Sequence, residues 1–384
     1  MSKTKKILHI SNTDIRYDSR ILKELEVLKK LEDCEVTAFG IEDEEEYQYN
    51  VKSTLNIRTF KLLSKKLKFL PRPARYFLNL IEAIIILTIP LLKLRPVIIH
   101  CHDTLYLPIA LIGKFFCKSQ LIYDAHELES DKAGQSKILS KYTLYIEKYA
   151  WKNIDLLISV SNSIIIWYND NFGKKESLLI LNSPVFDAEK YGQMKNNYLR
   201  EKFNIPFDKK IFIYLGILNG NGRGVKLYLD VFQRQNIDSH IVFIGYGECV
   251  TEIENIAQQH SNIHYHPAVP HNQVVEVSRS ADVGLCMLEP ASLSDFYCLP
   301  NKLFEYAFSG LFVLASDFPD IKQLVEEYSL GMCIPLNSDE ICKAVKWIES
   351  NGIEKDDKNL YQLSWAHQAE LLSDRYNKIL TNLK

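Results

Sequence analysis

The sequence predicts an α/β protein in which short parallel strands alternate with helices. Apolar runs of strand length recur along the chain, and most of them end in polar residues. Between these runs lie segments whose apolar residues recur at helical spacing. The alternation restarts near residue 210 after a polar stretch, and 384 residues are too many for one ordinary core. We therefore expect two domains that meet near residue 188.

The composition is that of a globular protein, with 47% hydrophobic and 24% charged residues. A net charge of −2 gives no reason to expect nucleic acid as a partner. The eight cysteines are scattered without a C-x-x-C pair and are expected to be reduced. The basic start MSKTKK precedes only a strand-length apolar run, so we expect no signal peptide and a cytoplasmic protein.

The first strand is expected at residues 6–10, where KILHI precedes a polar loop. Asp18 or Ser19 is placed to cap the helix that follows, since aspartate and serine are preferred caps. The other strands expected in the first domain are 35–40, 97–100, 121–124, 156–161 and 178–184.

Two of these strands end in acid–histidine clusters. The residues concerned are His102, Asp103, Asp124, His126 and Glu127. Such side chains can bind zinc, but no additional ligands follow at a recognisable spacing, so we expect no metal. For His100, within the strand, we expect a packed and hydrogen-bonded side chain.

Residues 61–95 form the most amphipathic segment of the chain. Its basic residues, which precede an apolar run at 77–90, are Lys61, Lys65, Lys66, Lys68, Arg72 and Arg75. Glu82 and Pro90 break the run, which is then shorter than the roughly 18 residues that suggest a membrane span. A buried helix and a helix lying on a membrane surface both fit this pattern. The basic residues favour peripheral contact with anionic lipid through residues 61–90.

The second domain begins with a strand at 210–216 and a glycine-rich loop that extends to Gly224. Glycines let backbone amides approach a ligand closely, and Arg223 can add a bidentate phosphate contact. A flexible turn is the alternative explanation of this loop. Further strands are expected at 240–247, which ends in the tight turn at Gly245, and at 262–270, 280–287 and 311–315.

Residues 300–320 form the strongest local candidate for a binding site. Lys302 and Glu305 begin a segment of helical periodicity, so both polar groups can point out of its first turn. Ser309-Gly310 ends this helix, and a buried strand follows. Ligands of open α/β sheets bind at the carboxyl ends of strands, and a lysine at a helix start suits phosphate. We therefore predict a phosphorylated sugar or nucleotide as the ligand, with an exposed ion pair as the alternative.

Four motifs follow one another along the chain: HCHDTLYLP, YDAHEL, the glycine-rich loop ending in RG, and PNKLFEYAFSGLFVLAS. Together they resemble those of retaining glycosyltransferases with the GT-B fold, of the family-four (group 1) type. The resemblance implies two Rossmann-like domains that face each other across a cleft. It implies an acceptor-binding domain at 1–187, a nucleotide-sugar-binding domain at 188–364, and a last helix, 365–384, that crosses back to the first domain.

The resemblance also implies roles for single residues on the donor side. Glu305 would contact the ribose, while Lys302 and Arg223 would lie near the diphosphate. The backbone around Val269 would bond the nucleobase. The expected donor-binding residues are Gly216, Arg223, Gly224, Gly245, Val269, Lys302, Leu303 and Glu305.

On the acceptor side, the resemblance implies that His126 faces the donor sugar. Asp103, Asp124 and Glu127 would orient it or contact the acceptor. The first loop is a further place for acceptor or phosphate contacts, which would come from Asp14, Arg16 and Arg20.

Two positions depart from the family pattern. Tyr297 stands where the family often has a glutamate over the donor sugar, and Ile217 stands where it usually has an arginine. The group that touches the sugar is therefore unassigned, and Lys302 is expected to be the second cation beside Arg223.

The expected reaction is the transfer of a sugar from a nucleoside diphosphate sugar to a hydroxyl of a glycan or lipid-linked acceptor. The resemblance implies retention at the anomeric carbon, no metal or other cofactor, and a part in bacterial surface polysaccharide synthesis. The enzyme would be cytoplasmic or peripheral at the inner face of the membrane. Two alternatives stay open: a GT-B nucleotide-sugar epimerase, and a catalytically silent subunit that binds a nucleotide sugar.

Overall fold

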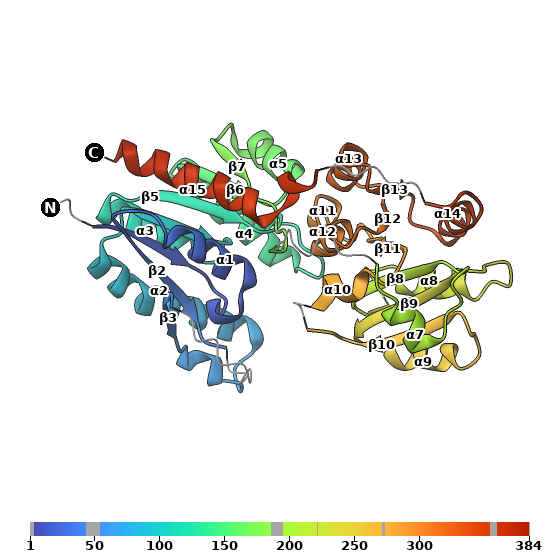
Figure 1. Cartoon of the computed structure of the whole chain (residues 1–384). Helices are drawn as coiled ribbons and strands as arrows, with labels where there is room; N and C mark the ends of the chain where they lie inside the picture. The colour runs from blue at the N-terminus through green and yellow to red at the C-terminus, as the bar shows by residue number, and fades with distance from the viewer. Residues whose placement is uncertain are drawn as a thin grey trace. The chain divides into compact units, whose positions relative to one another are not determined.

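The computed structural model describes residues 4–43, 54–185, 195–220, 222–270, 273–353 and 359–383. The chain divides into two compact units (Figure 1), the first made of Met1–Ile180 with Ala369–Lys384 and the second of Leu181–Gln368. The predicted boundary near residue 188 lies outside the described residues.

The first unit is built on a seven-stranded parallel sheet with the order β3-β2-β1-β4-β5-β6-β7. Its strands are β1 (Lys5–Ile10), β2 (Cys34–Ile41), β3 (Asn56–Phe60), β4 (Ile98–His102), β5 (Gln120–Ala125), β6 (Leu156–Ser159) and β7 (Ser177–Leu179). Its helices are η1 (Ile15–Tyr17), α1 (Ser19–Leu28), η2 (Leu63–Lys66), α2 (Arg72–Leu94), α3 (Leu107–Cys117), α4 (Lys137–Trp151) and α5 (Asn162–Phe172). The strand order reverses between β1 and β4, where His9 lies opposite His100 in the register.

The second unit is built on a six-stranded parallel sheet with the order β10-β9-β8-β11-β12-β13. Its strands are β8 (Ile211–Ile217), β9 (His240–Tyr246), β10 (Ile263–Pro267), β11 (Val283–Cys286), β12 (Phe312–Ser316) and β13 (Gly331–Ile334). Its helices are α7 (Tyr198–Phe203), α8 (Val225–Phe232), α9 (Val250–Ala257), α10 (Val274–Ser278), α11 (Leu293–Phe296), α12 (Asn301–Phe308), α13 (Pro319–Glu327), α14 (Ser338–Asn351) and η4 (Tyr361–Leu363). The order again reverses once, between β8 and β11, so both units have the Rossmann-like arrangement.

The last helix, α15 (Trp365–Asn382), returns to the first unit, which confirms that prediction. The buried Tyr376 hydroxyl lies 2.7 Å from His100 Nδ1, and the Lys5 ammonium donates to the Leu380 carbonyl at 2.5 Å. These contacts fix both ends of the chain on the same sheet.

Local sequence signals explain several of these elements. Asp18 caps α1 by accepting hydrogen bonds from the amides of Arg20 and Ile21, which confirms the predicted cap. All five residues of β4 are buried, as expected for a central parallel strand with covered faces. Pro90, where the predicted apolar run ends, does not interrupt α2, which continues to Leu94. All eight cysteines are free thiols, as expected.

Candidate functional site

Strands β8 and β9 of the second sheet pair in parallel, so their carboxyl ends lie side by side. Gly216 and Gly245 lie at these ends, with φ angles of 130° and 155°. A Cβ atom on Gly245 would lie 1.8 Å from the Gly216 carbonyl oxygen, so no larger residue fits there. The two predicted glycines therefore allow a close approach of backbone at the carboxyl end of the sheet.

Helix α12 is fixed at the same place by one tyrosine. The Tyr306 hydroxyl accepts a hydrogen bond from the Leu215 amide of β8 at 2.9 Å. Its ring covers Gly284 of β11, where an added Cβ would lie 2.3 Å from the ring. The start of α12 is thereby positioned beside the strand reversal between β8 and β11, where open α/β sheets bind ligands.

Lys302 and Glu305, whose polar groups were predicted to point out of the first turn of α12, are both buried. Their exposed fractions are only 8% and 9%, and every residue of α12 after Asn301 is buried. Helix α10 packs against α12, and the Ser309 hydroxyl at its end lies 3.2 Å from the Val275 carbonyl of α10. The two charged groups are therefore buried side chains of the candidate site, which excludes the surface ion pair.

The Lys302 ammonium has no hydrogen-bond partner among the described residues, although its nitrogen is fully buried. It lies 4.2 Å from the centroid of the Tyr214 ring, which stabilises a cation only in part. An ammonium removed from water without an anion is costly. Lys302 is therefore free to bind an anionic group.

Other charges converge on the same strand end. Burial raises the pKa of the Cys286 thiol, at the end of β11, to about 11, and Lys302, Glu305 and Arg223 all act on it electrostatically. Arg223 is exposed, between Gly222 and Gly224, whose φ angles are 79° and 70°. Two cations and one carboxylate thus gather where a ligand of this sheet would bind.

The glycine-rich loop is held by the segment after β11. The Glu289 amide donates to the Gly222 carbonyl at 3.3 Å. The Ser316 hydroxyl accepts from the Leu288 amide at 2.7 Å and donates to the Leu288 carbonyl at 3.0 Å. Gly224 begins α8 in the left-handed conformation, as its residue type permits.

The other positions that the sequence singled out on the donor side lie in varied environments. Leu303 is fully buried in the core, and its amide already donates to the Pro300 carbonyl at 3.0 Å. Val269 is half-buried and follows β10, at the edge of the sheet beyond β9. Ile217 is 41% exposed at the end of β8, and Tyr297 follows the short helix α11.

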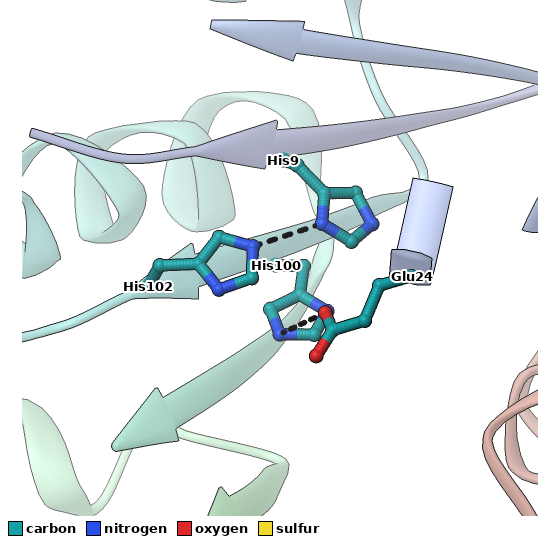
Figure 2. A group of neighbouring side chains, drawn as sticks. All are labelled: His9, Glu24, His100 and His102. Atoms are coloured by element: carbon teal, nitrogen blue, oxygen red, sulfur yellow. Dashed lines mark hydrogen bonds and ion pairs between the residues drawn. The ribbon is translucent and has the colours of Figure 1, made fainter. Parts of the chain in front are cut away.

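The strand reversal of the first sheet is filled by histidines (Figure 2). His9 comes from β1, while His100 and His102 come from β4, and all three are fully buried. His9 Nδ1 lies 3.0 Å from His102 Nε2, and the rings of His100 and His102 stack with centroids 4.4 Å apart. Burial lowers the pKa of each of the three, so their rings are neutral.

Asp124, from β5, is the buried anion of this cluster. The Arg20 guanidinium donates to both of its carboxylate oxygens, at 3.1 and 3.3 Å, and also lies 3.2 Å from Glu24. Burial raises the pKa of Asp124, but Arg20 and His126 lower it more and hold it well below its usual range. Arg20, which the resemblance nominated for ligand contact, is therefore buried within the cluster. Asp14 and Arg16, nominated with it, pair with each other.

His126 links this cluster to the surface. Its Nε2 lies 3.1 Å from both Asp124 Oδ2 and His102 Nδ1, and its Nδ1 lies 3.8 Å from Asp103 Oδ1. Burial lowers its pKa, but Asp103 and Asp124 raise it more, to about 10. His126 is therefore an imidazolium at neutral pH. Asp103 has a φ of 59°, a strained conformation for a residue with a side chain.

The structure thus brings His126, Asp103 and Asp124 together, as predicted, but not Glu127. The Glu127 side chain is 55% exposed and lies 3.3 Å from the Lys132 ammonium. Sequence reasoning missed His9, Glu24 and Tyr376 as members of the cluster. The only signal was the position of His9 at the end of a strand that pairs with β4.

Two groups of side chains in the first unit have donor atoms close enough to hold a metal ion. One is His9, Glu24, His100 and His102, and the other is His102, Asp124 and His126, each with atoms within 4.8 Å of one another. The Arg20 guanidinium already contacts both Glu24 and Asp124 and supplies the positive charge. Ion pairing with Arg20 therefore accounts for the carboxylates of both groups, and the absence of a metal stays a prediction.

Residues 209–351, which include β8, the glycine-rich loop and α12, match the glycosyl transferases group 1 family. Most of the second unit thus matches a group 1 glycosyltransferase domain. No curated protein sequence matches the chain significantly.

Several solved structures are similar to this chain along almost its whole length. A sucrose-phosphate synthase from Thermosynechococcus elongatus has a TM-score of 0.66 and 16% identity, over 98% of this chain and 94% of that one. The lipopolysaccharide outer core galactosyltransferase WaaB has a TM-score of 0.67 and 13% identity, over 99% and 100%. Anabaena HepE in complex with UDP has a TM-score of 0.64 and 13% identity, over 98% and 96%. At these identities the likeness establishes the GT-B fold and confirms that prediction.

The first unit also has a hollow of about 380 Å³ beside the loop after β4. Thr104, directly after Asp103, lines it, together with Leu139 and Tyr142 of α4. Glu129 and Lys132 line it as well and form an ion pair with each other. The hollow combines an apolar wall with charged groups, as small-molecule sites do.

Proposed function

We propose that this glycosyltransferase moves a sugar, with retention, from a nucleoside diphosphate sugar to a hydroxyl of a glycan or lipid-linked acceptor in bacterial surface polysaccharide synthesis. One observation carries the proposal: the buried Lys302 ammonium, at the strand reversal of the second sheet, has no hydrogen-bond partner among the described residues. A diphosphate would supply the anion that this position lacks.

The chemistry that these residues supply is electrostatic. When the bond between sugar and diphosphate breaks, negative charge develops on the leaving phosphate oxygen. Lys302, Arg223 and the amides at the start of α12 can stabilise that charge. The Glu305 carboxylate can accept hydrogen bonds from the ribose hydroxyls. We propose that these cations replace a metal ion, so no cofactor is required.

We take uridine as the first candidate for the base. The similar HepE structures contain UDP or UDP-glucose, and the similar trehalose-6-phosphate protein from E. coli is bound to UDP-2-fluoro glucose. The backbone after β10, around Val269, is the proposed place for the base.

For the first unit, we propose that His126 contacts the donor sugar. An imidazolium cannot accept a proton, so His126 would donate a hydrogen bond to a sugar hydroxyl rather than act as a base. Asp103 and Asp124 would keep it charged and oriented. The acceptor would lie in the hollow beside Thr104, close to Asp103 in the chain.

Binding of nucleotides tests the donor site directly. The protein would be titrated calorimetrically with UDP, GDP, ADP, TDP and CMP, with and without EDTA. The proposal predicts that one diphosphate binds and that EDTA does not change its affinity. The corresponding UDP-sugar or other nucleotide sugar should then be consumed only in the presence of an acceptor, whereas an epimerase would convert it alone. Failure of all five nucleotides to bind would contradict the donor site.

A further inference from the structure

Helix α2 exposes an apolar stripe on the side that faces away from its domain. Phe77, Ile81, Ile85 and Ile89 follow one another at intervals of four residues, with exposed fractions of 63%, 39%, 58% and 54%. The opposite side, with Ala83, Leu87 and Leu91, is fully buried. A helix that is apolar on both sides is unusual on a protein surface in water and requires a second apolar environment.

Among the described residues, α2 contains the one helix long and apolar enough to cross a membrane by length and composition, at Ala74–Leu94. Its contacts favour a position along the domain instead. Glu82 accepts hydrogen bonds from the amides of Leu63 and Ser64, both at 2.8 Å, and so attaches η2 to α2. With one side packed on the domain and one exposed, α2 has the character of an interfacial helix.

A groove of about 360 Å³ lies between η2 and α2. Its apolar lining residues are Leu63, Leu67, Leu78, Ile81, Ile85 and Ile86. The polar residues that line it, Ser64 and Glu82, bond to each other. The groove therefore offers hydrocarbon contacts and no free polar group among its lining residues, which suits an alkyl chain rather than a sugar.

Basic residues lie at both ends of this surface. Lys66 and Lys68 are exposed next to the groove, as is Phe69, whose exposed fraction is 80%. At the other end, Lys93 and Arg95 are exposed at the end of α2. Cations around an apolar surface complement the anionic head groups of a bilayer.

Helix α3 extends the surface. Gly113 allows α3 to approach α2, because a Cβ there would lie 2.7 Å from the Leu91 side chain. Phe115 and Phe116, in the last turn of α3, have exposed fractions of 63% and 77%. Helices α2 and α3 lie in the same unit (Figure 1) and pack directly against each other.

We propose that η2, α2 and the end of α3 dock the enzyme on an anionic membrane, and that the groove holds an acyl chain of a phospholipid. The biological purpose of this docking, access to a lipid-linked acceptor, rests on the proposed function. The structural observations that support the docking do not depend on it. A second copy of the chain fits this surface less well. Since both ends of the apolar stripe are basic, a two-fold contact would bring like charges together.

Flotation with vesicles tests the docking in the absence of donor and acceptor. Vesicles of phosphatidylcholine with phosphatidylglycerol should bind the protein at low salt, and vesicles of phosphatidylcholine alone should bind it more weakly. The Ile85→Glu variant should lose binding at least about tenfold, because it removes buried apolar area and adds a charge. Ile166→Glu on α5 is the matched control, since Ile166 is 57% exposed against 58% for Ile85. It should bind as the wild type does.

A second variant separates charge from apolar contact. Lys66→Glu/Lys68→Glu should weaken binding to the anionic vesicles roughly 25-fold or more, at about fivefold for each lysine, and should leave the weak binding to neutral vesicles unchanged. Equal loss in Ile85→Glu and Ile166→Glu, or no vesicle binding by the wild type, would overturn the proposal. So would a wild-type dimer in solution that Ile85→Glu converts to a monomer.

A photoreactive lipid tests the groove. A phosphatidylglycerol with a diazirine on its acyl chain should crosslink to peptides that contain residues 63–67 or 78–86. Crosslinks only in other helices would contradict the acyl-chain site. Nucleotide binding by the Ile85→Glu variant tests the donor site separately from the docking. The affinity of the variant for nucleotide should equal that of the wild type, whether or not the variant binds vesicles.

Discussion

The two sheets share one strand order but use the reversal of that order in opposite ways. In the first sheet, the reversal is filled by the rings of His9, His100 and His102. In the second sheet, the Tyr306 ring covers Gly284 of β11, but no atom lies within 4 Å of where a Cβ of Gly216 would be. A place for a ligand is therefore left beside Gly216, at the end of β8.

The two units also differ in whether their buried charges are paired. In the first unit, Arg20 and His126 are paired with Asp124, and the buried charges balance one another. In the second unit, the buried ammonium of Lys302 has no such partner among the described residues. The topology supplies two equivalent positions, and the side chains decide which of them can bind an anion. Four substitutions or titrations test this difference, beginning with the largest expected effect.

Replacing Arg20 by methionine should destabilise the first unit by about 3–5 kcal/mol, because it leaves Asp124 buried without its cation. The free energy of unfolding would be measured in urea, with hydrogen exchange of the β4 and β5 amides to localise the loss. Arg234→Met is the control, since Arg234 forms exposed ion pairs with Asp230 and Asp339 and its loss should have little effect on stability. Equal losses in the two variants would show that the first cluster does not depend on its charge balance.

Replacing Lys302 by methionine should reduce the affinity for the nucleoside diphosphate about 10- to 150-fold, the value of a lost hydrogen bond to a charged group. Stability should stay the same or rise, because a buried ammonium without a partner is removed. Calorimetric titration and thermal unfolding measure the two effects. Lys322→Met serves as the control, because the Lys322 side chain is 48% exposed and its ammonium lies 2.9 Å from the Asp317 carboxylate. If Lys302→Met binds as tightly as the wild type, Lys302 does not hold the diphosphate.

Replacing Tyr376 by phenylalanine should destabilise the first unit by about 1 kcal/mol. The substitution removes the buried hydrogen bond to His100 Nδ1 at 2.7 Å. Tyr328→Phe is the matched control, since its hydroxyl bonds to Gln362 at the surface and its loss should have little effect. The two variants would be compared by urea unfolding, and a larger loss in Tyr328→Phe would contradict the account of the cluster.

The last test follows the stability of the protein with pH. The pKa of His126 is about 10 in the folded protein and 6.5 as its ordinary value, so folding favours its protonated form. This stabilisation is complete below pH 6.5, declines as pH rises, and is absent above about pH 10. The unfolding free energy of the wild type should therefore decline more steeply over this range than that of His126→Gln. Parallel pH profiles would show that His126 is not held as an imidazolium.

Much of the fold could be predicted from strand-length apolar runs, because central parallel strands are buried on both faces. The edge strands β3 and β13 gave no such signal, since most of their residues are half-buried or exposed. Pro90 interrupts the apolar run of the sequence but not the helix, because α2 continues to Leu94. A strand can be predicted from the sequence only where its burial leaves a run of apolar residues.

The candidate site was predictable in position but not in environment. Lys302 and Glu305 were found from their place before a buried strand, whereas their burial depends on packing against α10 and the sheet. The pair of Arg20 and Asp124 joins residues 104 positions apart, and no local spacing indicates such a contact. The membership of His9 follows only from the register of β1 against β4.

The most direct test of the account is hydrogen exchange of the whole protein with and without UDP, or with whichever nucleoside diphosphate binds. The account predicts that the ligand slows exchange in residues 215–224 and 300–308 of the second unit and leaves 98–126 of the first unit unchanged. Protection confined to β4 and β5 would contradict it, because the nucleotide would then bind where the histidines already fill the sheet.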